Sequence, residues 1–181
     1  MCALEGGRLR LVAARKSYED LDNAQRPRVE RLCRLLLADP AEAQDVAQEV
    51  LMKLFRAQQT RPETTSWDRW VMRVTVNACR DRRRSAWWRR FRSDDSVLRE
   101  DDLISPVAGP EDAAIAGEVR RRVWAAFRGL SRRQQEVFAL RHVEDLSTAK
   151  VAEALGMSQG SAKRHLFRAV HRLRLALRGA S

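Results

Sequence analysis

The chain has 181 residues, of which 44% are hydrophobic and 33% are charged, and its formal net charge at neutral pH is +11. This composition is typical of a globular protein and excludes a disordered one, and the excess of positive charge indicates a polyanionic partner such as a nucleic acid. No apolar run approaches the roughly 20 residues that a membrane-spanning helix requires, and the first residues lack the apolar core of a signal peptide, so we expect a cytoplasmic protein.

The first helix is predicted over residues 18–37, where apolar residues recur at helical spacing. Pro27 is expected to start or interrupt this helix, because proline has no N–H to donate to the preceding turn. Cys33, and Cys79 further along the chain, fall in helical patterns. The three cysteines form no Cys-x-x-Cys unit, so we expect both residues to be buried, reduced thiols.

A second helix is predicted from Pro40 to about Gln58. Asp39 is a typical helix cap, and Glu42 stands where a capping-box acid reaches back to the cap. The apolar stripe of this helix consists of Ala43, Val46, Ala47, Val50, Leu51 and Leu54. The neighbouring face carries Asp45, Gln48, Glu49 and Met52. Spacing alone leaves open whether that face is an ordinary solvated surface or an acidic docking surface for a basic partner.

A polar loop is predicted over residues 59–65, followed by a helix that Ser66 caps and that continues through Asp81. In residues 82–92, arginines alternate with two tryptophans and a phenylalanine. Arginine pairs with phosphates and aromatic rings stack on unpaired bases, so this run favours nucleic-acid binding. The alternative is a basic helix end whose tryptophans pack on the neighbouring domain.

Residues 93–112 carry seven acidic residues against one arginine, together with two prolines and a glycine. Such a stretch is typical of a linker. The sequence shows no strand-like alternation of apolar and polar residues. We therefore predict an all-α chain of two small helical domains, residues 1–92 and 111–181, joined by an acidic linker at 93–110.

The second domain is predicted to begin with a helix over residues 113–129, followed by a capping box that opens at Ser131. A helix-turn-helix unit comes next. In it Ser147 caps one helix, Gly156 can adopt the positive φ that ends this helix, and Ser158 caps the second.

The second helix of this unit has charge of one sign. No acidic residue follows Glu153, whereas the basic residues are Lys163, Arg164, Arg168, Arg172, Arg174 and Arg178. The second helix of a helix-turn-helix enters the major groove, so the pattern favours DNA binding over a merely solvated basic helix.

Three segments in this order resemble the extracytoplasmic-function (ECF) sigma factors, the compact branch of the bacterial sigma-seventy family. They are residues 39–54, 70–84 and 130–169. The resemblance implies that the first binds the clamp helices of the RNA polymerase β′ subunit, the second melts and reads the minus-ten element, and the third binds the minus-thirty-five element. It also implies that the acidic linker threads the RNA channel of polymerase, with a plain solvated tether as the alternative.

The resemblance also assigns individual residues. The polymerase-docking residues are Asp45, Gln48, Glu49, Met52 and Lys53. The minus-ten residues are Gln59, Thr60, Arg61, Trp70, Asn77, Arg80, Asp81, Arg83 and Arg84. The minus-thirty-five residues are Ser158, Gly160, Ser161, Lys163, Arg164, Phe167 and Arg168.

By this resemblance the protein is a transcription initiation factor. Its implied partners are core RNA polymerase, through the β′ clamp helices and the β flap, promoter DNA, and the anti-sigma protein that the family commonly has. We expect no enzymatic activity, metal or cofactor, because the sequence has neither His/Cys metal spacing nor a Gly-rich phosphate loop. The alternative is a polymerase-independent helix-turn-helix regulator, which would bind its DNA target tightly as the free chain.

Overall fold

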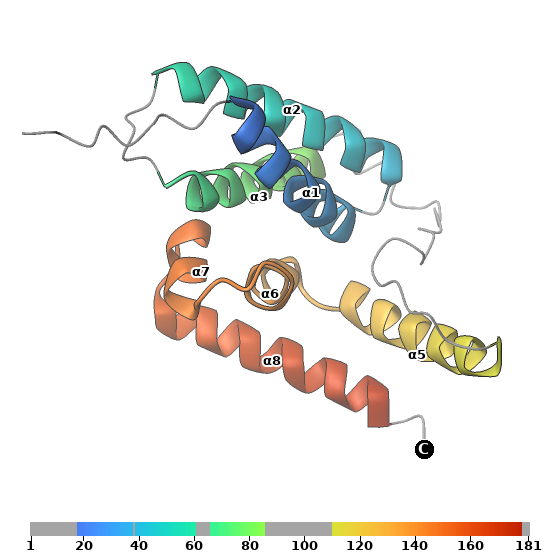
Figure 1. Cartoon of the computed structure of the whole chain (residues 1–181). Helices are drawn as coiled ribbons and strands as arrows, with labels where there is room; N and C mark the ends of the chain where they lie inside the picture. Colours follow the sequence, from blue (N-terminus) through green and yellow to red (C-terminus); the bar gives the residue numbers. More distant parts are fainter. Residues whose placement is uncertain (1–17, 38, 61–65, 86–109, 179–181) are drawn as a thin grey trace, which may run out of the picture.

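The computed structural model describes residues 18–37, 39–60, 66–85 and 110–178 (Figure 1). The helices are α1 (Tyr18–Leu36), α2 (Pro40–Thr60), α3 (Trp67–Arg84), α5 (Pro110–Arg128), α6 (Arg132–Phe138), the π-helical segment η3 (Ala139–Val143), α7 (Thr148–Leu155) and α8 (Gln159–Arg178). These ranges contain no strand, which confirms the predicted all-α fold. No helix in them is long and apolar enough to span a membrane.

The helices form two layers, with α1, α2 and α3 in one and α5 to α8 in the other (Figure 1). The layers touch where α3 packs against α7, and buried apolar residues from both belong to one cluster. Almost all of the predicted linker, together with Trp87, Trp88 and Phe91, lies outside the described residues. Only Pro110 is described, as the first residue of α5.

Pro27 lies inside α1 without ending it, so the prediction of an interruption was wrong. The proline and Asn23, whose carbonyl loses its helical donor, are both on the exposed side of the helix. Water can therefore satisfy the carbonyl, while the opposite side buries Val29 and Leu32 completely.

Asp39 caps α2 as predicted, because its Oδ1 accepts hydrogen bonds from the N–H groups of Ala41 (2.7 Å) and Glu42 (3.1 Å). The predicted apolar stripe is buried throughout. Two expectations were wrong. The Glu42 carboxylate does not complete a capping box but pairs with Arg82, and Gln59 and Thr60 form the last turn of α2 rather than a loop.

Ser66 precedes α3 but makes no capping hydrogen bond through its side chain, contrary to expectation. Inside the layer, Cys33 of α1 and Cys79 of α3 are buried free thiols, as predicted, with their Sγ atoms 3.9 Å apart. The hydrogen bond to Cys79 and burial both raise the pKa of the Cys33 thiol far above its usual value.

Helices of the second layer begin and end at capping residues that were predicted from the sequence. Ser131 and Gln134 form the predicted capping box of α6. Ser147 caps α7 through the N–H of Lys150, and Gly156 ends α7 with φ of 63°. Ser158 accepts from the N–H of Ser161 at the start of α8, so the predicted helix-turn-helix is confirmed.

One feature of this layer has no counterpart in the sequence-based expectations. α6 continues into a π-helical turn, in which Glu144 N–H donates to the carbonyl of Ala139 at 3.1 Å. Asp145 then adopts a positive φ of 49°, which aspartate tolerates better than most residues. This turn orients Glu144 toward the other layer.

Candidate nucleic-acid interface

The outer face of α8 is an exposed surface without acidic residues. Ala162 and Ala169 pack inward and are fully buried, whereas Lys163, Arg164 and Arg168 are exposed. Because every charge on this helix has the same sign, it can approach the phosphates of a duplex along its whole length.

Two details shape the start of α8. Ser158 Oγ donates to Ser161 Oγ at 3.0 Å, and Arg164 Nη2 donates to the same Ser161 oxygen at 3.3 Å. Phe167 is 73% exposed as a residue, and its ring stacks on that of His171 with centroids 6.2 Å apart. An apolar ring this exposed within a basic face can contact a thymine methyl group in a major groove. The residues predicted for minus-thirty-five recognition therefore lie together, with Ser158 just before α8 and the others in its N-terminal half.

The predicted docking residues share one exposed face of α2, as their spacing requires. All five are exposed: Asp45, Gln48, Glu49, Met52 and Lys53. Glu49 is not a free charge, because Arg82 Nη2 lies 2.7 Å from its Oε1, while Nη1 of the same arginine contacts Glu42. Burial lowers the pKa of Arg82, but Glu42 and Glu49 outweigh this effect, so the pKa is raised.

The predicted minus-ten residues divide into an exposed set and a covered set. Gln59, Thr60, Asn77, Asp81 and Arg84 are exposed, and Trp70 is half-buried with its ring edge-on to Trp67. Arg61 lies outside the described residues. Arg80 and Arg83, by contrast, are covered by α6 of the second layer.

Arg80 binds Glu136 of α6 in a two-point contact, with Nε 2.8 Å from Oε1 and Nη2 2.7 Å from Oε2. The Glu136 side chain is only 3% exposed, and Arg133 of its own helix adds a contact at 3.3 Å. Paired hydrogen bonds of this geometry are among the strongest that charged side chains make. This contact joins the two layers.

Arg83 is less well paired. Its Nη2 donates to the neutral amide oxygen of Gln135 at 3.3 Å, and 6% of the residue is exposed. Burial lowers the pKa of Arg83. Burial also lowers the pKa of Arg128 of the second layer, to about 10, with the charge of Arg83 as a further cause.

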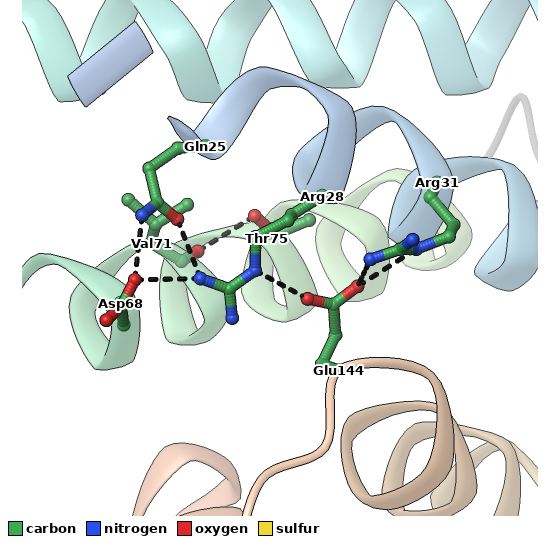
Figure 2. A network of polar contacts seen from close by, with 7 residues as sticks. All are labelled: Gln25, Arg28, Arg31, Asp68, Val71, Thr75 and Glu144. Atoms are coloured by element: carbon green, nitrogen blue, oxygen red, sulfur yellow. Dashed lines mark hydrogen bonds and ion pairs between the residues drawn. The ribbon is translucent and has the colours of Figure 1, made fainter. Parts of the chain in front are cut away.

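A second contact between the layers is centred on Glu144 (Figure 2). Its side chain is fully buried, with Oε2 2.8 Å from Arg28 Nε and Oε1 3.0 Å from Arg31 Nη2. Arg28 also donates to Asp68 at 2.7 Å, and Gln25 donates to the same Asp68 oxygen at 2.8 Å. Burial lowers the pKa of Arg28, but Glu144 and Asp68 outweigh it, so the pKa is raised.

Sequence reasoning did not identify the residues of this contact between layers. Glu136 and Glu144 are polar residues at positions where the helical period expects apolar ones, and this mismatch is the only signal that could have indicated them. It could not have identified their partners, which lie 56 and more residues away along the chain. Across the described ranges, no group of three or more His, Cys, Asp or Glu side chains could hold a metal ion.

This arrangement, a helix-turn-helix with an exposed acid-free second helix packed on a three-helix layer, is that of a DNA-binding protein. Comparisons with known proteins specify which kind. Residues 21–89 match the family model Sigma-70 region 2, and residues 120–173 match the model Sigma-70, region 4.

Two relatives and one solved structure illustrate the likeness. The RNA polymerase sigma-E factor of Streptomyces coelicolor is 32% identical over 157 residues, which cover 87% of this chain and 84% of that protein. The ECF RNA polymerase sigma factor SigL of Mycobacterium tuberculosis is 33% identical over 78% of each chain. The sigma factor RpoE from Bartonella quintana, solved in complex with the anti-sigma factor NepR, shares the fold with a TM-score of 0.68 at 22% identity, over 89% of this chain and 96% of that one.

The chain therefore belongs to the sigma-70 family of RNA polymerase sigma factors, in its ECF branch, and is a transcription initiation factor. This confirms the resemblance drawn from the sequence.

The contrast between the two covered arginines gives a stability prediction. Arg83→Met should raise the free energy of unfolding by about 1 kcal/mol, because it removes a desolvated cation whose hydrogen-bond partner among the described residues is the neutral amide of Gln135. Arg80→Met should instead lower it by roughly 2–3 kcal/mol, because buried Glu136 then loses its main partner. Urea unfolding followed by circular dichroism measures both. Equal losses of unfolding free energy in the two variants would contradict the conclusion that Arg80 is well paired and Arg83 is not.

Proposed function

We propose that this sigma factor recruits core RNA polymerase through the exposed face of α2 and reads the minus-thirty-five element with α8, without catalysing a reaction itself. The observation that carries the proposal is that the two layers present surfaces of opposite character. One is a face with exposed carboxylates, such as Asp45, and the other is a recognition helix with only positive charge. The first suits a basic protein partner and the second suits phosphates. The β′ clamp helices and the β flap are the proposed polymerase contacts.

The proposed minus-ten function belongs to α3 and to the segment that follows α2. Asn77, Asp81 and Arg84 lie on the exposed side of α3, on successive turns. Holding an unstacked base costs a few kcal/mol, which contacts to the extruded base must offset. In this proposal α3 lies along the melted strand while the end of α2 and residues 61–65 hold a flipped base.

Two further elements of the proposal follow from the relatives. The polymerase-independent regulator is not favoured, because the matches to sigma factors cover both layers of the fold. The Bartonella quintana neighbour was solved with an anti-sigma factor, and we propose a comparable inhibitory protein partner for this chain. As a transcription factor of this family it would act in the cytoplasm, beside the chromosome.

The direct test is transcription in vitro from the promoters that this factor serves in its host. Core polymerase with this protein should produce a specific transcript. The control is the same core without it. Equal transcription by core alone would refute the proposal.

Docking can be tested by one charge reversal. Asp45→Arg should weaken binding to core polymerase by about tenfold or more, because it puts a positive charge on the face that meets a basic partner. Asp45 is a cleaner choice than Glu49, which already pairs with Arg82. The matched control is Glu19→Arg, an exposed acid on α1 outside the docking face. Fluorescence anisotropy with labelled protein measures both affinities, and equal values for the two variants would exclude α2 as the docking surface.

Base reading can be tested at Phe167. Phe167→Ala should lower holoenzyme affinity for a duplex carrying the minus-thirty-five element by about 1 kcal/mol, since it removes an apolar contact to a base. Leu175→Ala is the control, because Leu175 is also an exposed apolar residue of α8, 54% exposed, but lies two turns further on. A gel-shift titration compares them. The proposal predicts a loss only at Phe167, and a similar loss at Leu175 would argue against it.

A further inference from the structure

The core of the first layer contains two thiols that face each other. Cys33 of α1 and Cys79 of α3 are 0% and 1% exposed, and their Sγ atoms lie 3.9 Å apart although the residues are 46 positions apart in sequence. Both are free thiols. A single buried cysteine is usually an inert packing residue, whereas two facing sulfurs can also react with each other. A disulfide requires a sulfur separation of about 2 Å, which side-chain rotation and a small approach of the helices can supply.

A buried cation lies beside this pair. Arg83 stands one helical turn beyond Cys79 on the same face of α3, and 6% of the residue is exposed. Its hydrogen-bond partner among the described residues is the neutral amide of Gln135. Burial lowers the pKa of Arg83, whereas a negative charge on Cys79 raises it. The same attraction acts in the other direction, so Arg83 stabilises the thiolate of Cys79, which is the nucleophilic form.

The surroundings of Cys33 favour the protonated thiol. The hydrogen bond to Cys79 raises the pKa of Cys33 most, and burial raises it further. The negative charges of Cys79, Glu30 and Glu49 act in the same direction. Cys33 therefore retains its proton when Cys79 loses one. The two sulfurs have the unequal properties of an attacking and a resolving cysteine.

We propose that Cys33 and Cys79 form a reversible disulfide when the protein meets hydrogen peroxide, with Cys79 as the attacking sulfur and Cys33 as the resolving one. The Cys79 thiolate attacks one peroxide oxygen and the O–O bond breaks. The product is a sulfenic acid, and the leaving hydroxide combines with the proton that Cys79 released.

In the second step the sulfur of Cys33 attacks the sulfenic sulfur of Cys79. The S–S bond forms, the S–O bond breaks, and the hydroxyl group leaves as water with the proton of Cys33. Two thiols and one peroxide give one disulfide and two waters, so the sulfurs are oxidised and the peroxide oxygens are reduced. The second step is fast because the resolving sulfur is already adjacent.

The disulfide preserves the core in a way that a sulfenic acid does not. A sulfenic acid would place a polar group among buried apolar side chains, whereas the disulfide is apolar and ties α1 to α3. Peroxide reaches the buried sulfurs when the layer opens locally, so the reaction is slow. Asn77 and Asp81 lie on the exposed side of α3 and remain accessible in the cross-linked protein. A thiol reductant reverses the linkage, as is typical of disulfides in the cytosol.

The experiment uses the full chain with Cys2→Ser, which leaves only the two core thiols. The folded protein is treated with hydrogen peroxide, and its intact mass and linked peptides are measured by mass spectrometry. We expect a monomer that lacks two hydrogen atoms and in which the peptides of Cys33 and Cys79 are joined. Its thermal unfolding midpoint should be higher than that of the reduced protein by roughly 5–10 °C, because the cross-link restricts the unfolded chain. Dithiothreitol should restore the original mass and midpoint.

Three results would overturn the inference. They are folded protein that keeps both thiols, sulfinic acid in place of the linkage, and a linkage that forms only after unfolding in urea. A lower midpoint in the cross-linked protein would overturn its stabilising effect. These measurements leave both core cysteines unchanged, so they do not depend on whether a core variant folds.

Cys33→Ala in the same background removes the resolving sulfur. Cys79 should then stop at the sulfenic acid, which dimedone traps, or proceed to sulfinic acid, and peroxide should lower the unfolding midpoint. Circular dichroism checks that the reduced variant is helical. A midpoint that peroxide raises in this variant as much as in its parent would contradict the assignment of Cys33 as the resolving residue.

The role of Arg83 is tested by the rate of disulfide formation. Arg83→Met should slow it by about tenfold, because less of Cys79 is present as thiolate. Arg83→Lys, which keeps a cation, should retain most of the rate. The matched control is Arg73→Met, since Arg73 is an exposed arginine of the same helix that donates to the backbone carbonyl of Glu153. Equal rates in the two methionine variants would overturn the role of Arg83. None of these measurements involves polymerase or DNA, so their outcome is independent of the proposed function.

Discussion

The burial of two carboxylates under arginines of another layer is the constraint that sets how this molecule is assembled. Glu136 and Glu144 lose nearly all contact with water, which costs several kcal/mol for each ion unless close partners replace it. Arg80 and the Arg28–Arg31 pair are those partners. Apolar surfaces can slide with little penalty, whereas a two-point arginine–carboxylate contact tolerates few relative positions of its two helices. The layers therefore meet in one register.

Local backbone structure places both glutamates. The Ser131 capping box fixes the first turn of α6, and Glu136 follows on the side that faces α3. Glu144 depends on a less regular device, the π-helical turn followed by Asp145 in the left-handed region. A regular α-helix through residues 139–143 would change the direction of the Glu144 side chain, because each residue of an α-helix advances by about 100°. The irregular turn is thus coupled to the contact between layers.

These origins explain which features the sequence could predict. The caps at Asp39, Ser147 and Gly156 depend on a few neighbouring residues, and each formed as expected. Local reasoning failed where a distant partner or solvent decided the outcome. Glu42 does not form the predicted capping box but pairs with Arg82, which lies 40 residues further along the chain. Pro27 was tolerated because the fold turned its side of α1 toward water.

The site shows the same division. Spacing on one helix correctly grouped the exposed residues of α2, since the period of a helix fixes which side chains share a face. The resemblance assigned Arg80 and Arg84 to the same strand of DNA, yet the structure covers the first and exposes the second. That difference comes from α6, whose position relative to α3 depends on contacts between residues far apart in sequence. Pattern analysis of a single helix contains no information about it.

One charge pattern accounts for both the contact between layers and the open recognition helix. The acids of the second layer that face α1 and α3 are Glu136, Glu144 and Glu153. The carboxylate of Glu153 binds Arg69 at 2.9 Å, and its backbone carbonyl accepts a hydrogen bond from Arg73 at 3.4 Å. All three precede Gly156, and α8 beyond it has no acidic residue. Acids interspersed along α8 would have paired with its own cations four residues away, as Arg122 does with Glu118 in α5, and would have weakened its attraction to phosphate. The acids that precede Gly156 therefore bind arginines of the first layer, whereas α8, which follows Gly156, keeps its positive charge available for DNA.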